Sequence, residues 1–128
     1  YMAPEQIEGR QPDARSDIYG LGGVACFLLS GRPPFERETS LELYAAHIDA
    51  PVPRLRDRVA DLPADLEALI MRCLAKTPGA RFQDVEELAA ALLATTCSGQ
   101  WSSTQAKAWW QTHAQPADAP GTEPGSPA

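Results

Sequence analysis

The sequence predicts an all-α protein with a disordered tail. Runs of alternating apolar and polar residues, the pattern of a half-buried β-strand, are almost absent. Apolar residues instead recur at intervals of three and four in several separate segments, as they do along one face of an α-helix. Short connections that contain proline and glycine separate these segments, so the helices are expected to pack as neighbours around one core.

The longest helix is predicted to begin at Ser16 and to end at Gly31. A serine is a favourable N-cap, and a glycine readily adopts the left-handed conformation that ends many helices. Apolar side chains occur on all sides of this segment, which predicts a helix that is packed on every side. Its apolar stretch, residues 18–29, is shorter than the roughly 20 residues of a membrane span, so we interpret it as a core helix.

Three shorter helices are predicted to follow. The first covers Ser40–Ile48. The second begins at Pro63, a residue type favoured at helix starts, and Pro78-Gly79 ends it. The third begins at Asp84, where Glu87 three positions later indicates a capping box. The last two helices each carry one apolar stripe, formed by Leu66, Leu69, Ile70, Cys73 and Leu74 in one and by Val85, Leu88, Ala89, Leu92 and Leu93 in the other.

A fifth, weaker helix is predicted within residues 97–114, where Ser102 and Gln105 form another capping-box pattern. Trp109 and Trp110 lie on its apolar face. From residue 115 the composition changes to proline, glycine, alanine and acidic residues, and no large apolar side chain remains to be buried. Residues 115–128 are therefore expected to be a disordered linker or tail.

Three separated motifs occur in a fixed order along the chain. Ala3-Pro4-Glu5 comes first, the segment Asp17-Ile18-Tyr19-Gly20-Leu21-Gly22 second, and Lys76-Thr77-Pro78-Gly79-Ala80-Arg81-Phe82 third. Each alone is a weak match, but together they resemble the Ala-Pro-Glu, Asp-x-Trp/Tyr-x-x-Gly and Lys-x-Pro-x-x-Arg motifs of serine/threonine protein kinases. The chain is most similar to the eukaryotic-type kinases of bacteria, and the resemblance covers residues 1 to about 94.

The resemblance implies that residues 1–96 are the C-terminal part of the kinase large lobe. They would comprise the end of the activation segment and the last four helices of the lobe, and the tryptophan-rich helix would cap the back of the lobe. Arg81 would pair with Glu5, because the planar guanidinium can bind a carboxylate at two points. The alternative is that both residues are unrelated surface charges.

The family also suggests roles for other residues. Asp17 would hold backbone N–H groups of the catalytic loop, although an ordinary helix-start role is a fair alternative. Tyr1 and Met2 would line the substrate site beside the phosphoacceptor, or would simply pack as apolar residues. Ala3, Pro4 and Gly22 would be structural members of their motifs. Phe27 stands where many relatives carry a glutamate that favours basic substrates, so no preference for arginine upstream of the target residue is implied.

The residues that perform phosphoryl transfer are missing from this sequence. There is no G-x-G-x-x-G loop, no His-Arg-Asp and no Asp-Phe-Gly; the glycines at positions 20, 22 and 23 fall inside a predicted helix. No catalytic, cofactor-binding or metal-binding residue is therefore predicted. We expect a fragment that is inactive alone, from a parent that would use ATP and Mg²⁺ to phosphorylate serine or threonine in a protein substrate.

The alternative is a non-catalytic, truncated or pseudokinase-like helical module that binds partners through Ser40–Ile48 and through exposed helix faces. The DNA upstream of the codon for Tyr1 would distinguish the two hypotheses. An in-frame segment encoding the missing motifs supports the kinase, and a nearby start codon without them contradicts it.

Composition excludes several other classes of function. The net charge of −6 with no block of basic residues disfavours nucleic-acid binding, and the tryptophan pair has no basic neighbours. The three cysteines are widely spaced, which predicts reduced thiols and a cytoplasmic protein, with any membrane anchor of the parent lying downstream. His47 and His113 lack partners at metal-ligand spacing and are predicted to be core or surface histidines. The oligomeric state and the substrate remain open.

Overall fold

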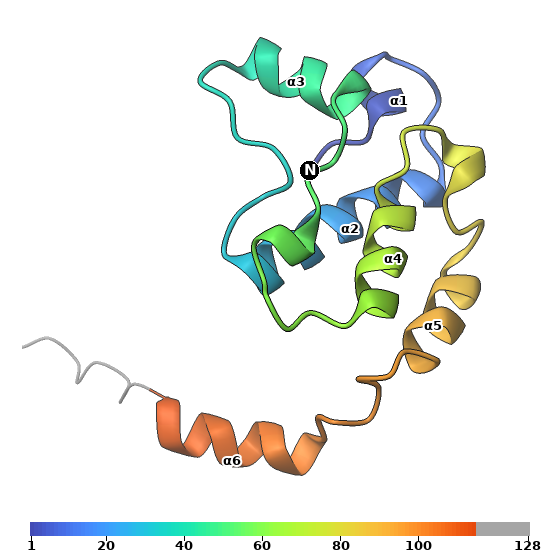
Figure 1. The fold of residues 1–128 in the computed structure, drawn as a ribbon. Helices are drawn as coiled ribbons and strands as arrows, with labels where there is room; N and C mark the ends of the chain where they lie inside the picture. The colour runs from blue at the N-terminus through green and yellow to red at the C-terminus, as the bar shows by residue number, and fades with distance from the viewer. Residues whose placement is uncertain (115–128) are drawn as a thin grey trace, which may run out of the picture. The chain divides into compact units, whose positions relative to one another are not determined.

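The structure, a computed structural model, describes residues 1–114, and every regular element in this range is helical (Figure 1). The predicted disordered tail, residues 115–128, lies outside the described residues. Two short 3₁₀ turns cover Leu55–Asp57 and Pro78–Ala80. The α-helices are α1 (Pro4–Ile7), α2 (Ala14–Ser30), α3 (Ser40–Asp49), α4 (Ala64–Cys73), α5 (Val85–Leu93) and α6 (Ser103–His113). The prediction of an all-α fold is therefore confirmed for these residues.

The chain divides into two compact units. The first, Tyr1–Ser98, holds the hydrophobic core, and α2 packs against α4 along its centre (Figure 1). The core is formed by Ala3, Ile18, Tyr19, Cys26, Leu55, Leu62, Leu69, Ile70, Cys73, Leu74, Phe82 and Leu88. Four of the five residues in the predicted apolar stripe of α4 belong to it, which explains why this short helix forms.

The start of α2 differs from the sequence prediction. The helix begins at Ala14 with Asp13 as its N-cap, because the Asp13 carboxylate accepts a hydrogen bond from the Arg15 backbone N–H at 2.8 Å. Ser16 lies inside the first turn, where its hydroxyl accepts a bond from the Asp13 N–H at 3.3 Å. Serine thus completes the cap from the other side rather than forming it. The predicted end is confirmed: Gly31 has a φ of 72° and closes the helix.

The described residues cover only one side of α2, and the resemblance implies that part of its remaining apolar surface would contact other helices of the lobe. Phe27 is 48% exposed and Leu28 is 76% exposed, and Leu21, Val24 and Leu29 are also exposed. Only the face that carries Ile18, Gly22 and Cys26 is buried, against α4 and the surrounding core. One wide apolar face of this helix is therefore left uncovered.

The caps of the later helices follow the sequence closely. Thr39 caps α3 and Ser102 caps α6, each with the reciprocal bond of a capping box. At α5 the Asp84 carboxylate accepts from the Glu87 N–H at 2.7 Å as predicted. The Glu87 carboxylate, however, accepts from the Gln83 N–H at 2.8 Å, one residue before the expected donor. The second bond of the capping box is thus displaced by one residue. The backbone N–H groups of Gln83 and Glu87 both have acceptors at this helix start.

Gly22 is required for the close packing of α2 on α4. A Cβ atom at this position would lie 2.8 Å from the Cys73 Cβ and 3.0 Å from the Leu74 Cγ. We expect Gly22→Ala to lower the free energy of unfolding by about 1–3 kcal/mol, because the two helices must separate to admit the methyl group. Urea denaturation followed by circular dichroism measures this loss.

Gly20→Ala is the matched control, because it introduces the same methyl group in the same helix. Its Cβ would meet only the Tyr1 backbone oxygen, at 3.5 Å, an ordinary contact. We expect this variant to be neutral or more stable by up to about 1 kcal/mol, since alanine favours helix more than glycine does. Equal losses in the two variants would contradict the steric explanation.

The second unit contains α6, and its side chains are mostly exposed. The ring of His113 stacks on that of Trp109 with centroids 4.3 Å apart, and Trp109 meets Trp110 edge to face at 5.0 Å. Trp109 and His113, one turn apart, thus stack along the helix, and Trp110 contacts Trp109 from the neighbouring position.

Candidate functional site

The first motif forms a short buried turn at the start of the chain. Ala3, Pro4 and Glu5 are all buried, and Pro4 occupies the first position of α1, where its missing N–H leaves no donor unpaired. The Ala3 N–H donates to the Gln6 side-chain oxygen at 2.9 Å. These bonds fix the direction in which the Glu5 carboxylate enters the core.

Arg81 meets that carboxylate from the connection between α4 and α5. Its Nη1 and Nη2 atoms donate to the two oxygens of Glu5 at 2.6 and 2.8 Å, which is a bidentate ion pair across 76 residues of sequence. The three remaining N–H groups of the guanidinium donate to the backbone oxygens of Arg15, Ala75 and Lys76. All five donors of Arg81 are therefore used, and the side chain is 0% exposed.

The carboxylate of Glu5 is equally well bonded. Besides Arg81 it accepts a hydrogen bond from the Ser16 hydroxyl at 2.7 Å. The hydrogen bonds from Arg81 outweigh the effect of burial and lower the pKa of Glu5 to about 2. The Tyr19 ring lies against the guanidinium, 5.0 Å from the Arg81 Cζ, so the charge is covered by an aromatic face. Glu5, Ser16 and Arg81 form a charged cluster that joins α1, the start of α2 and the α4–α5 connection.

Asp17 follows Ser16 in the sequence but is not part of this charged cluster. Its side chain is exposed at the first turn of α2, and no hydrogen bond or ion pair joins it to another described residue. The carboxylate is favourably placed at the positive end of the helix dipole. Of the predicted structural residues, the structure brings Ala3, Pro4, Glu5 and Arg81 together and leaves Asp17 apart.

Tyr1 and Met2 lie at the surface, 53% and 47% exposed. The Tyr1 backbone passes Gly20 of α2, and its ring lies against Gly23. Phe27, the residue that departs from the expected glutamate, is exposed further along the same helix. Apolar side chains thus occupy the surface where the resemblance places substrate contacts.

A second polar cluster, which the sequence did not predict, fixes α3. The Tyr19 hydroxyl and His47 Nδ1 are 2.7 Å apart and both side chains are buried. Phe35 packs edge to face on the His47 ring at 5.1 Å. Burial raises the pKa of Tyr19, so its hydroxyl stays protonated and forms a neutral hydrogen bond with the imidazole, whose tautomer sets which group donates. Burial also lowers the pKa of His47 to about 4, with smaller contributions from the nearby amino terminus and Lys76.

Lys76 completes this cluster from the third motif. Its Nζ atom donates to the backbone oxygens of Ala46 and His47 at 3.1 and 2.9 Å, at the C-terminal end of α3. A positive charge is favourable there, because the last carbonyl groups of a helix lack partners. The same atom lies 4.6 Å from the centre of the Phe35 ring. No local sequence pattern could have joined these residues, since they come from separate elements.

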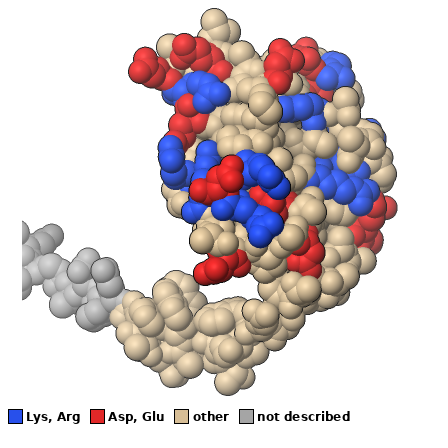
Figure 2. All heavy atoms as spheres, viewed as in Figure 1, with Lys and Arg blue, Asp and Glu red and all other residues tan. Residues whose placement is uncertain are grey.

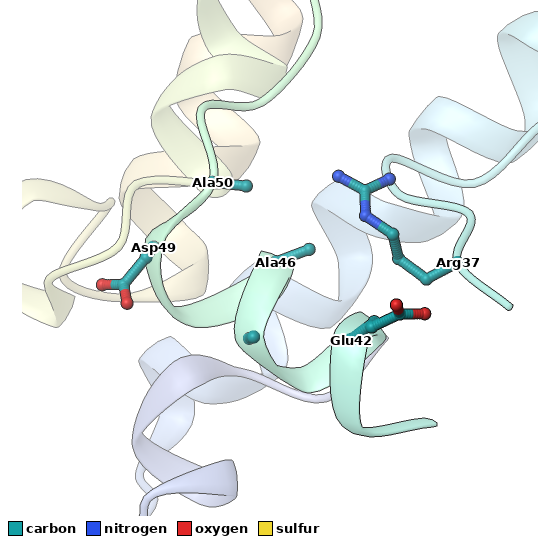
Figure 3. Close-up of a pocket in the computed structure, with 6 residues that line it drawn as sticks. Arg37, Glu42, Ala46, Asp49 and Ala50 are labelled. Atoms are coloured by element: carbon teal, nitrogen blue, oxygen red, sulfur yellow. The ribbon is translucent and has the colours of Figure 1, made fainter. Parts of the chain in front are cut away.

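An open hollow of about 420 Å³ lies along α3 (Figure 3). Arg37 and Glu42 lie at one end of it and Asp49 at the other, with alanine side chains between them. A second, wholly apolar groove of about 270 Å³ follows α2, α4 and α5 and is lined by residues that include Leu21, Leu28 and Leu66. Neither hollow combines a nucleophile with a base or a cluster of metal ligands.

The charges of the first unit are mixed rather than separated. On the face drawn in Figure 2, acidic side chains lie among the arginines and lysines. Within residues 1–114 no group of three or more histidine, cysteine, aspartate or glutamate residues could hold a metal ion. Cys26, Cys73 and Cys97 are free thiols, and burial raises the pKa of the first two to about 11. None of the described helices has the length and apolarity needed to cross a membrane.

The chain is similar to known proteins over the first unit. A profile of the protein kinase domain matches residues 1–94. Serine/threonine-protein kinase PknB of Mycolicibacterium smegmatis is 40% identical over 94 residues, which are 73% of this chain and 15% of the relative. PknB of Mycobacterium tuberculosis is 39% identical over 94 residues, again 73% of this chain and 15% of the relative.

Solved structures give the same result for the fold. The crystal structure of the Mycobacterium tuberculosis PknI kinase domain is 34% identical, with a TM-score of 0.55. The match covers 71% of this chain and 32% of that kinase domain. This chain thus spans about 15% of the length of the curated relatives and about a third of a solved kinase domain.

Proposed function

The chain belongs to the protein kinase family, and from this premise we propose that it is the helical C-terminal part of a serine/threonine kinase large lobe. The longer protein would transfer the γ-phosphoryl group of ATP to serine or threonine in a protein substrate. The buried Glu5–Arg81 pair is the observation that carries the proposal. It ties the turn that follows Tyr1 and Met2 to the connection between α4 and α5. The serine/threonine kinases among the relatives support the choice of substrate residue.

This segment supplies position rather than chemistry. The Glu5–Arg81 pair fixes the turn that follows Tyr1 and Met2, so these two side chains are held where a protein substrate would bind. Asp17 projects into solvent, and in the proposal its carboxylate accepts N–H groups of a catalytic loop from outside these residues. Gly22 allows α2 to pack closely on α4, and this packing fixes the position of the helix that carries Asp17. The free thiols agree with a cytoplasmic location for this part.

The residues of this chain do not fit ATP or Mg²⁺. Protein kinases hold ATP with a glycine-rich loop and a strand lysine, and hold Mg²⁺ with an aspartate and an asparagine of two further loops. The sequence contains none of these motifs, and the described carboxylates form no cluster that could bind a metal ion. No step of phosphoryl transfer is therefore assigned to residues 1–128.

We expect isothermal titration of the 128-residue chain with Mg-ATP to give no binding heat at micromolar concentrations, because the phosphate-binding residues are missing. A complete kinase domain such as that of PknB is the positive control under the same conditions. Micromolar affinity of the 128-residue chain would contradict this assignment of its residues.

Phosphate transfer by the whole reading frame tests the proposed function itself. The frame that contains these residues is expressed, and incorporation of phosphate from ATP into serine or threonine of a general protein substrate is measured. Transfer that is lost on Glu5→Gln in a protein that remains folded supports the proposal. A folded whole protein without transfer contradicts it.

A non-catalytic, partner-binding module is the second candidate, and α3 favours it. Leu41 and Tyr44 are exposed on this helix next to the hollow formed by Arg37, Glu42 and Asp49. Binding of a protein to the 128-residue chain that is lost on Leu41→Glu, together with the absence of phosphate transfer by the whole protein, would favour this candidate.

A further inference from the structure

The chain's first residue crosses α2 directly over two glycines. Gly20 and Gly23 are three positions apart, so they lie on one face of the helix. A Cβ atom on Gly20 would lie 3.5 Å from the backbone oxygen of Tyr1. A Cβ atom on Gly23 would lie 2.6 Å from Cδ1 of the Tyr1 ring, with Cε1 and Cγ at 3.4 and 3.5 Å. The ring therefore occupies the space that a side chain at position 23 would fill.

This contact explains a glycine that the helix itself disfavours. Glycine weakens a helix interior relative to alanine, and Gly23 has an ordinary helical backbone with no positive φ. Real Cβ atoms essentially never approach another heavy atom to less than 3.0 Å, so at 2.6 Å the Tyr1 ring must move to admit alanine at this position. Gly23 is buried, whereas Tyr1 as a whole residue is 53% exposed. One side of the ring faces the helix, and the exposure of Tyr1 leaves its other side toward solvent.

We propose that Gly23 is a positioning residue for Tyr1 and, through Tyr1, for the substrate-lining pair Tyr1–Met2. This inference rests on the proposed function, in which that pair lies beside the phosphoacceptor. The pair Tyr1–Met2 is held at two points. The Glu5–Arg81 pair fixes its C-terminal side, and the Tyr1 ring rests on Gly23, a contact that we call the seat. The seat leaves the outer side of the ring free to contact a peptide substrate.

The first test examines the seat in the 128-residue chain, without any activity. Nuclear Overhauser contacts between the Tyr1 ring protons and the Gly23 Hα protons are expected in the wild-type chain. We expect Gly23→Ala to abolish the contacts between the ring and position 23, while the bonds of the Arg81 guanidinium to Glu5 are retained. Gly20→Ala, the matched control, is expected to keep the ring contacts. A ring that stays on position 23 in Gly23→Ala overturns the proposal.

The second test measures the effect on substrate binding in the whole protein. We expect Gly23→Ala to raise the KM for a serine- or threonine-containing peptide about 10-fold with a smaller change in kcat, as the loss of one binding contact would. Gly20→Ala is expected to leave both constants unchanged. The decisive comparison uses Tyr1→Ala, which removes the ring that the seat holds.

If Gly23 acts through Tyr1, adding Gly23→Ala to Tyr1→Ala causes no further increase in KM. An increase of the same size in both backgrounds means that Gly23 acts through helix packing, and it overturns the proposal. If the wild-type whole protein transfers no phosphate, the proposed function fails, and the ring contacts in the 128-residue chain alone decide whether Gly23 seats Tyr1.

Discussion

Replacing Arg81 with methionine is expected to lower the free energy of unfolding of the 128-residue chain by about 3–5 kcal/mol. The substitution leaves the buried carboxylate of Glu5 with the Ser16 hydroxyl alone. It also removes the hydrogen bonds that Arg81 donates to the backbone oxygens of Arg15, Ala75 and Lys76. Methionine fills much of the volume, so the loss reflects unpaired polar groups rather than a cavity.

Chemical denaturation followed by circular dichroism measures the loss, and two further variants give its origin. Glu5→Gln removes the negative charge and leaves the guanidinium buried without it, so a loss of similar size is expected. Arg81→Lys keeps a charge but cannot bind the carboxylate at two points, so it should fall between wild type and Arg81→Met.

The exposed pair Arg32–Glu36 provides the matched control. It has the same chemistry, with an N–O distance of 2.5 Å, but both side chains are about half exposed. Glu36→Gln is expected to change stability far less than Glu5→Gln, because water screens and replaces an exposed partner. The double variant Glu5→Gln/Arg81→Met should lose less than the sum of its single variants. Equal losses in Glu5→Gln and Glu36→Gln would contradict the role of burial.

The ion pair also indicates how far the sequence could predict the fold and the site. Helix ends and apolar stripes follow from local chemistry, and both ends of α3 and the starts of α4 and α6 were predicted to within one residue. The end of α4 was predicted at Pro78-Gly79, whereas the helix ends at Cys73. Glu5 and Arg81 are 76 positions apart, and no local sequence pattern connects them. The pairing was inferred only because three motifs occur in the order found in a known family, which is information about a whole fold.

The N-cap of α2 was predicted at Ser16 and lies at Asp13. Asp13 and Ser16 are both good cap residues, and the choice between them depends on where the Ser16 hydroxyl goes. It is buried against Glu5, a partner 11 residues away, which local propensity cannot anticipate. The exposed face around Leu28 is likewise a property of what packs nearby, whereas the sequence reports only that the residue is apolar.

The cluster around His47 was missed for a related reason. A histidine without neighbouring ligands is usually a core or surface residue, and position 47 gives no signal that distinguishes these cases. Its partners Tyr19, Phe35 and Lys76 lie on three other segments. Only the third motif offered a hint, since its lysine had no assigned role. The two polar clusters share Tyr19, whose ring faces Arg81 and whose hydroxyl meets His47.

Acid should destabilise the first unit in two successive, slightly overlapping pH ranges, because both clusters contain a group whose pKa is lower in the folded state. The pKa of His47 falls from 6.5 to about 4 on burial, and that of Glu5 falls from 4.5 to about 2 beside Arg81. In each case the unfolded chain binds the proton more tightly. The stability due to His47 is complete above pH 6.5 and lost as the pH falls to 4, and that due to Glu5 is complete above pH 4.5 and lost as the pH falls to 2.

Each group should contribute about 3 kcal/mol, since one unit of pKa corresponds to about 1.4 kcal/mol. The range between pH 6.5 and 5 is the informative one, because the unfolded His47 is at least half protonated throughout it. A carboxyl group with an ordinary pKa of 4.5 binds only about a quarter of a proton even at pH 5. We expect the free energy of unfolding, measured by urea denaturation at each pH, to decrease through this range in the wild-type chain.

His47→Asn tests the assignment because its side-chain amide can accept from or donate to the Tyr19 hydroxyl without binding a proton. We expect this variant to have a much flatter stability profile between pH 6.5 and 5 than the wild type and to retain the decrease at lower pH that Glu5 causes. His113→Asn removes the other histidine, which is exposed on α6, and should keep the wild-type slope. A His47→Asn profile as steep as that of the wild type would mean that the buried imidazole is not the group that couples protons to folding.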